Sequence, residues 1–240
     1  MKTVFTIAKK EYELALHSIS TYIVYILFLV IIGIIFSNMV FKIARAELRF
    51  LFEVIHIVFL FYIPAITMGS IAKERQTGTL ELLSTLPIKL SSIVWGKILS
   101  ALFQIITIII LSLVFFGIIV IFGEGIDYGA IICGYIGLIL AGLAYASIGV
   151  FASSFPSNQI LAFVLALLFS AVFYLLKFLL PLLPFGLVPI VQYFSFDYHL
   201  SSFLKGVIDT RDILFFLAVT VIFALLAQFN LQSKNLMQEK

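Results

Sequence analysis

Residues 21–41, with the sequence "TYIVYILFLVIIGIIFSNMVF", contain no charged side chain. An α-helix needs about 20 consecutive apolar residues to cross the hydrocarbon core of a bilayer, and this stretch supplies them. The rest of the chain has the same character, because 63% of its 240 residues are hydrophobic, 11% are charged and the mean hydropathy is +1.21. Soluble domains carry roughly 25% charged residues. We therefore predict an all-α, polytopic membrane protein.

Similar apolar runs recur along the chain and form one transmembrane domain over residues 1–240. The six predicted spans cover about residues 21–41, 51–71, 98–123, 128–152, 159–180 and 212–231. Ahead of the first span, apolar residues recur at helical spacing over residues 1–20, which predicts an amphipathic helix lying at the membrane interface. Between the last two spans, prolines, aromatics and charges are mixed, and this predicts short helices at the outer leaflet.

The distribution of basic residues predicts the orientation. With the N-terminus inside, nine lysine and arginine residues fall in cytoplasmic segments and six in outer segments. Both termini are therefore expected in the cytoplasm of a bacterial cell, with the chain in the inner (cell) membrane. The net charge of +3 is too small to indicate a nucleic-acid partner, and the lipid bilayer explains it better.

Motifs for several kinds of chemistry are missing from the sequence. It contains no phosphate-binding G-x-x-x-x-G-K-[ST], no H-E-x-x-H, no Cys/His cluster and no G-x-S-x-G. The single cysteine, Cys133, excludes an intrachain disulfide. We expect no enzymatic activity, no cofactor and no metal in this chain.

Ionisable residues within membrane spans often mark transport pathways. His56, in the second span, is the best candidate for a polar site inside the bilayer, while Glu53 is placed near the outer interface. Lys177, near the end of the fifth span, is interpreted as a lysine that extends its ammonium group toward the interface. These residues are fewer than an ion-driven carrier ordinarily needs, so secondary transport is disfavoured.

The fourth predicted span is rich in small residues, which let another helix approach closely. This pattern is compatible with a dimer seam or moving contact, but packing inside one bundle is the favoured interpretation. The small residues are Ala130, Gly134, Gly137, Ala141, Gly142, Ala146 and Gly149.

The second and third spans are separated by the charged stretch "AKERQTGTLELLSTLPIKLSSIVWGK", residues 72–97. Gly78 is expected at a helix start or a tight turn where a side chain would obstruct. From Thr79 the chain can form about two helical turns, which Pro87 ends. Leu80, Leu83 and Leu86 share one side of this helix. Two turns are not stable alone in water, so the leucines need the membrane surface or a groove on another protein.

This stretch resembles the permease subunits of the ABC-2 type of ATP-driven transporter. The resemblance consists of E-R-x-x-G-T-L-E-L-L-x-x-x-P followed by G-K. The matching residues are Glu74, Arg75, Gly78, Thr79, Leu80, Glu81, Leu82, Leu83, Pro87, Gly96 and Lys97. The later stretch "HLSSFLKGVIDTRDILFFL" is similar to the branch that contains gliding-motility permeases and permeases for nitrous-oxide-reductase maturation.

The resemblance implies a mechanism. Two permeases, usually identical, would pair in the bilayer as a homodimer, and two separate ATPase subunits would dock beneath them. The segment after Gly78 would be the cytoplasmic coupling helix, and transport would most simply be export. The residues implied in ATPase coupling are Glu74, Arg75, Gly78, Thr79, Leu80, Glu81, Leu83 and Pro87. Two alternatives stay open, namely a charged loop that only fixes topology, and a non-transporting membrane anchor or mechanical scaffold that uses the same fold.

Overall fold

The computed structural model describes residues 2–43, 48–79, 89–122, 126–184 and 186–238, and all regular structure in these ranges is helical. Six of the helices are long and apolar enough to cross a membrane, namely α2, α3 continued by α4, α6, α7, α8 and α11. The all-α fold class and the six candidate spans are thus confirmed. The elements are α1 (Lys2–Leu16), α2 (Ile19–Ile43), α3 (Arg49–Thr67), α4 (Ala72–Gln76), α6 (Leu90–Phe122), α7 (Tyr128–Ser153), α8 (Gln159–Leu179), η1 (Leu180–Leu182), α9 (Val188–Tyr193), α10 (Phe196–Leu204) and α11 (Thr210–Gln238).

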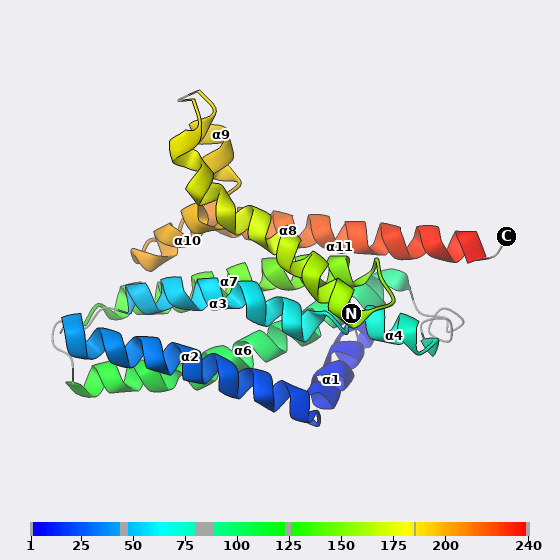
Figure 1. The fold of residues 1–240 in the computed structure, drawn as a ribbon, viewed down its shortest axis with the longest axis horizontal. Coiled ribbons are helices and arrows are strands. Elements are labelled where there is room, and N and C mark those ends of the chain that lie inside the picture. Colours follow the sequence, from blue (N-terminus) through cyan, green and yellow to red (C-terminus); the bar gives the residue numbers. More distant parts are fainter. Residues whose placement is uncertain (1, 44–47, 80–88, 123–125, 185, 239–240) are drawn as a thin grey trace.

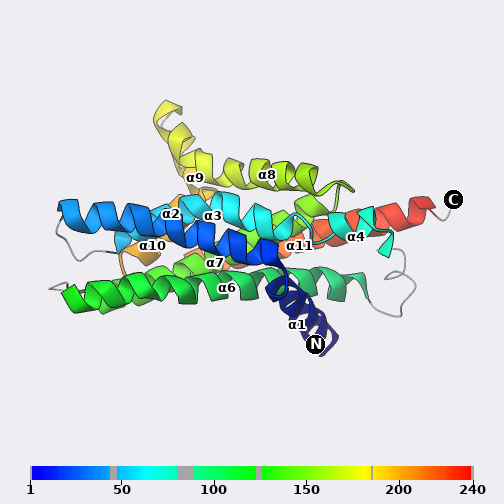
Figure 2. The ribbon, with the colours of Figure 1, turned by 60° about the horizontal axis from the view of Figure 1, so that its bottom comes forward.

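The long helices form an elongated bundle with two distinct ends (Figure 1). One end carries α4, the N-terminal helix α1 and the C-terminal end of α11, and we call it the α4 end. The opposite end carries the C-terminal end of α2 and the start of α3, and α10 lies toward it; we call it the α10 end. Helix α8 diverges from the bundle, so that η1 and α9 project sideways from it (Figures 1 and 2).

Helix α7 lies at the centre of the bundle and packs against α3, α6, α8, α10 and α11. Its span is the most buried of the six, at 72%. Beside each of its inward-facing glycines, the space that a larger side chain would need is occupied by a side chain from another helix of the same chain. Gly134 and Gly149 meet Phe52 and Thr67 of α3, Gly137 meets Phe203 of α10, and Gly142 meets Ile105 of α6. The glycines of this span are therefore explained by packing inside one bundle.

The N-terminal helix α1 packs on α6 through its apolar side. Ala8 is fully buried, and Gly96 of α6 admits Ile7 so closely that a Cβ at Gly96 would lie 2.6 Å from the Ile7 Cγ2 atom. The Tyr12 hydroxyl lies 2.6 Å from the Thr107 hydroxyl of α6. Some of the apolar residues in the amphipathic pattern of residues 1–20 thus pack against α6 and not against lipid.

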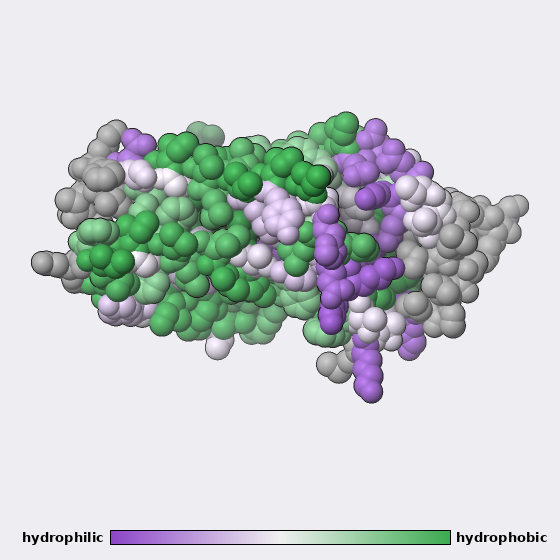
Figure 3. Space-filling model, turned by 90° about the horizontal axis from the view of Figure 1, so that it is seen from below, coloured by the Kyte–Doolittle hydropathy of each residue, from purple (hydrophilic) through white to green (hydrophobic). Residues whose placement is uncertain are grey.

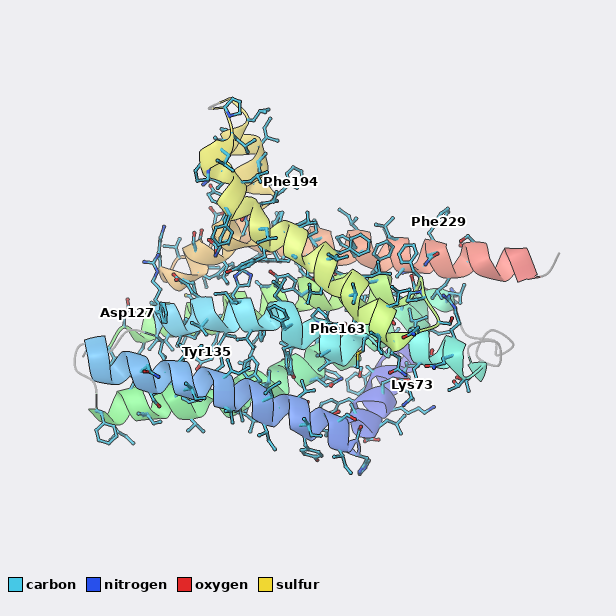
Figure 4. All side chains as sticks on the ribbon, in the orientation of Figure 1. Lys73, Asp127, Tyr135, Phe163, Phe194 and Phe229 are labelled. Atoms are coloured by element: carbon cyan, nitrogen blue, oxygen red, sulfur yellow. The ribbon has the colours of Figure 1, made fainter. Side chains whose placement is uncertain are left out.

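The surface separates into an apolar band and a polar end (Figure 3). Apolar side chains cover most of the length of the bundle, whereas hydrophilic side chains gather toward the α4 end, where α1 lies. Lys73 lies at this end and Asp127 at the opposite one (Figure 4). This division is the one expected when lipid surrounds the middle of the molecule and water meets its ends.

Candidate functional site

The corner between α3 and α4 is held by a serine from a different helix. The Ser153 hydroxyl, at the end of α7, accepts hydrogen bonds from the backbone N–H groups of Ile71 and Ala72, each at 3.0 Å. It donates to the Met68 carbonyl at 2.9 Å. The first N–H groups of a helix have no partner within that helix, and Ile71 provides no side-chain cap for α4. Ser153 therefore caps α4 from α7.

Arg75 of α4 makes the reverse connection. Its Nη1 atom donates to the carbonyl of Ser154 at 2.7 Å and to the carbonyl of Phe155 at 2.9 Å. Both carbonyls lie just beyond the end of α7, where the negative end of the helix dipole favours a cation. Helices α4 and α7 consequently cap each other.

Lys97 brings two further helices to this corner. Its Nζ atom lies 2.6 Å from Oε1 of Glu74 on α4 and 3.7 Å from Oε1 of Glu11 on α1. The Lys97 side chain is only 2% exposed, although it belongs to the long helix α6. A buried ammonium group is tolerated only when it is paired, and here two carboxylates surround it. We call Glu11, Glu74, Arg75, Lys97 and Ser153 the α4 cluster.

Two further hydrogen bonds extend the α4 cluster to α8 and α11. The Gln159 side-chain amide donates to the Gln76 side chain at 3.4 Å. The Asn230 amide of α11 donates to the Ser154 hydroxyl at 2.6 Å. The five-residue helix α4 is therefore connected to α1, α6, α7 and α8, while α11 is bonded to the end of α7.

Gly78 ends α4 in a left-handed conformation, with φ of +71°. Its N–H bonds to the Arg75 carbonyl at 3.3 Å, an arrangement that glycine adopts readily after a helix. No described atom lies within 4 Å of a Cβ built at Gly78. The prediction of a turn at Gly78 is confirmed, but the reason is the backbone angle and not the obstruction of a side chain.

The sequence-predicted coupling residues divide into two groups. Four are described: Glu74 and Arg75 belong to the α4 cluster, and Gly78 forms the turn after α4. Thr79 donates to the Glu74 carbonyl at 3.2 Å. The other four, Leu80, Glu81, Leu83 and Pro87, lie in residues 80–88, outside the described part of the chain. The helix expected there stays a prediction.

His56 is enclosed within the bundle. It is 1% exposed, and its Nε2 atom lies 3.0 Å from the Tyr145 hydroxyl of α7. The Tyr174 ring of α8 meets the imidazole edge-on at a centroid distance of 5.3 Å. These contacts give His56 protein partners on two helices, and a role in transport stays a hypothesis.

The residues that sequence interpretation missed lie around α10. Lys177 of α8 pairs with Asp197 at 2.9 Å and lies over the Tyr174 ring, 4.3 Å from its centroid. His199, two residues further along α10, lies 2.6 Å from Asp212 of α11. We call Lys177, Asp197, His199 and Asp212 the α10 cluster. Lys177 was interpreted only as an interfacial lysine, and the one available signal was the presence of charges inside a proline-bounded, aromatic segment.

Metal ligation has no candidate in the described ranges, where no group of three or more His, Cys, Asp or Glu side chains could hold an ion. Each residue of the α4 and α10 clusters instead makes at least one ion pair or hydrogen bond to another helix, although Glu74 Oε2 and Asp212 Oδ2 are buried without a described hydrogen bond. This arrangement suits mechanical connection between helices.

The comparison with protein families gives a match over almost the whole chain. A family model described as ABC-2 family transporter protein matches residues 5–238, from α1 to the end of α11. The match is to the family as a whole and does not select the gliding-motility or nitrous-oxide-reductase branch. A comparison with curated proteins found no match.

Proposed function

Because the chain belongs to the ABC-2 family of transporter proteins, as a membrane permease without an ATPase domain, we propose that it is driven by a separate ATPase subunit docked at its α4 end. Family membership implies such a partner. The observation that carries the proposal is the α4 cluster, in which a five-residue helix is bonded to several long helices. The predicted coupling segment starts directly after this helix.

The α4 cluster supplies the physical basis for coupling. A helix of five residues has no stability of its own, so the position of α4 follows its contacts with α7 and α6. The chain leaves α4 at Gly78 in a fixed direction and enters residues 80–88. If the leucine side of that segment lies in a cleft of the ATPase, its displacement is passed to Glu74 and Arg75 and then to Lys97 and α7.

The proposed orientation places the α4 end in the cytoplasm, where ATP is available. Both chain ends lie toward this end of the bundle, in agreement with the basic residues counted in the sequence. The α10 end then faces outward across a bacterial inner membrane. We further propose that two copies pair as a homodimer and act in export, in the branch suggested by the final stretch of the sequence.

Co-purification tests the docking proposal. Leu83→Asp places a charge on the leucine side of the segment and Glu81→Lys reverses a charge beside it, so both should insert normally but lose the co-expressed ATPase. Ser84→Asp is the matched control, because it adds the same charge away from the leucine side, and it should retain the ATPase. Normal co-purification with both variants would contradict the proposal.

Reconstitution of the permease–ATPase complex in vesicles distinguishes a transporter from a scaffold. The complex in vesicles should hydrolyse ATP faster when its substrate is present and should move that substrate. A complex that retains the ATPase yet shows neither stimulation nor flux, across the cargo classes tested, would instead be a membrane scaffold.

A further inference from the structure

Helix α10 is fixed to α11 by a buried histidine–carboxylate pair. The His199 Nδ1 atom lies 2.6 Å from Asp212 Oδ1, and the two side chains are 1% and 7% exposed. The imidazole ring is stacked on Phe215 of α11, with a centroid distance of 3.8 Å and an interplanar angle of 17°. The pair therefore lies at the contact between the two helices, away from water.

The hydrogen-bond partners fix the number of protons in this pair. His199 Nε2 lies 2.8 Å from the Tyr193 carbonyl oxygen, which can only accept, so Nε2 carries a hydrogen. At Nδ1, a lone pair facing an ionised carboxylate at 2.6 Å would be repulsive. A proton consequently lies between Nδ1 and Asp212 Oδ1, whichever of the two atoms it is formally bound to.

In the described part of the chain, His199 is the side chain that pairs with Asp212. Its second oxygen, Oδ2, is buried and makes no hydrogen bond in the described structure. The carboxylate depends on His199, because a buried charge without a partner is strongly unfavourable.

We propose that the His199–Asp212 pair is a proton-binding site whose bound proton docks α10 on α11. When the proton passes to solvent, a neutral imidazole presents its lone pair to a buried carboxylate, and the contact between the helices weakens. Docking is thus complete while the pair holds this proton, and it weakens when the proton is lost at higher pH. This inference is independent of the ATPase partner and concerns the other end of the bundle.

No described carboxylate other than Asp212 is paired with His199. Asp197, on the same helix, is already paired with Lys177 of α8, so it does not compete for the His199 proton. The elements packed around His199 carry several titratable or charged residues near this end of the bundle. They are Tyr193 of α9, Asp197 and Tyr198 of α10, Tyr174 and Lys177 of α8, Tyr128, Cys133, Tyr135 and Tyr145 of α7, and Asp209, Arg211 and Asp212 at the start of α11.

Other contacts of α10 do not depend on this proton. Phe203 and Leu200 fill the space beside Gly137 of α7. Loss of the proton should therefore loosen the α10–α11 contact locally and leave the bundle folded.

Cys133 provides a native probe of this loosening. It is the single cysteine of the chain, it is 8% exposed, and its Sγ atom lies 3.6 Å from the Gly206 carbonyl in the turn between α10 and α11. Its alkylation by N-ethylmaleimide would be followed in the full-length protein in lipid nanodiscs, from about pH 5 to about pH 10, a range that covers ordinary histidine and thiol titration. Each rate is divided by that of the same chain unfolded in detergent, which removes the intrinsic pH dependence of the thiol.

The expected result is a normalised labelling rate that is low at acid pH and rises by about tenfold or more at alkaline pH, because labelling follows the population of the locally opened state. Asp212→Asn should abolish this rise and keep labelling slow, because its amide N–H can donate to Nδ1 of a neutral His199. His199→Gln should also be independent of pH, since its amide N–H donates to Asp212 without titrating. Asp209→Asn is the matched control and should keep the wild-type profile.

Several outcomes would overturn the proposal. One is a flat profile in the wild-type protein, and another is a wild-type rise that persists in Asp212→Asn or His199→Gln. Rapid labelling of Asp212→Asn at every pH would also count against it, because the amide is expected to preserve docking. The two variants act on opposite members of the pair, so the test stands if either one folds, as judged by size-exclusion chromatography.

Discussion

The two ends of the bundle attach short helices in different ways. At the α4 end, Lys97 is surrounded by two carboxylates, and α4 and α7 exchange backbone caps through Ser153 and Arg75. At the α10 end, a histidine shares its proton with Asp212, and a partly exposed lysine pairs with Asp197. Histidine is the side chain whose charge ordinarily changes near neutral pH. The comparison indicates a permanent attachment at the α4 end and a conditional one at the α10 end.

The largest effect is expected from Lys97→Met, which removes the cation of the α4 cluster. The change leaves Glu74 and Glu11 without their cation in a buried site, and breaking a buried pair costs about 3–5 kcal/mol. The free energy of unfolding, measured by detergent titration, should fall by that amount, and ATPase coupling should be lost. Lys89→Met is the control, because Lys89 is exposed just before the same helix. Equal stability of the two variants would show that the α4 cluster is not a permanent attachment.

The packing of α10 is tested next by Gly137→Ala. The added Cβ would lie 2.6 Å from the Phe203 Cβ atom, so α10 has to move, at a cost of about 1–3 kcal/mol. Cys133 labelling should also become faster at every pH. Gly117→Ala on α6 is the matched control, since no described atom lies within 4 Å of its added Cβ. If both alanines behave alike in unfolding and labelling, α10 is not fixed by this contact.

A smaller effect is expected from Gly78→Ala, which tests the left-handed turn at the α4 end. A φ of +71° costs a residue with a Cβ about 1 kcal/mol relative to glycine. ATPase stimulation should drop because the segment after α4 leaves in a different direction. Gly78→Asn should retain more activity, since asparagine tolerates the left-handed region better. A larger loss with asparagine than with alanine would contradict the backbone explanation.

The smallest effect is expected from Lys177→Gln at the α10 end. Lys177 and Asp197 are 26% and 37% exposed, and such pairs contribute at most about 1 kcal/mol. The loss in unfolding free energy should therefore be several times smaller than that of Lys97→Met. Comparable losses would mean that the two lysine pairs are equally important and that the two ends differ less than their burial suggests.

The sequence predicted the parts that depend on local pattern. The six spans follow from apolar runs, and Glu74 and Arg75 were selected because they belong to one contiguous motif. The pairing of Lys97 with Glu11 could not be predicted, because it requires α1 to dock on α6 beside Gly96. The α10 cluster was missed for the same physical reason, since Lys177, His199 and Asp212 come from three helices and meet only after folding.

The glycines of α7 show a different limit of sequence interpretation. Small residues permit close approach, but their spacing does not say which helix approaches. In the structure, side chains from α3, α6 and α10 of the same chain occupy the space beside these glycines. Residues 80–88 lie outside the described ranges, so the leucine-sided segment remains a prediction that the co-purification experiment addresses.

The mutual capping of α4 and α7 has a consequence for how movement spreads. The Ser153 side chain is bonded to the backbone at the start of α4, and the Arg75 side chain is bonded to the backbone at the end of α7. A tilt of α4 should therefore move the end of α7 with it. Helix α7 touches five other helices, so such a tilt starts at the middle of the molecule and reaches each neighbour across one interface. A displacement that began at a peripheral helix such as α2 would cross several interfaces and lose amplitude at each of them.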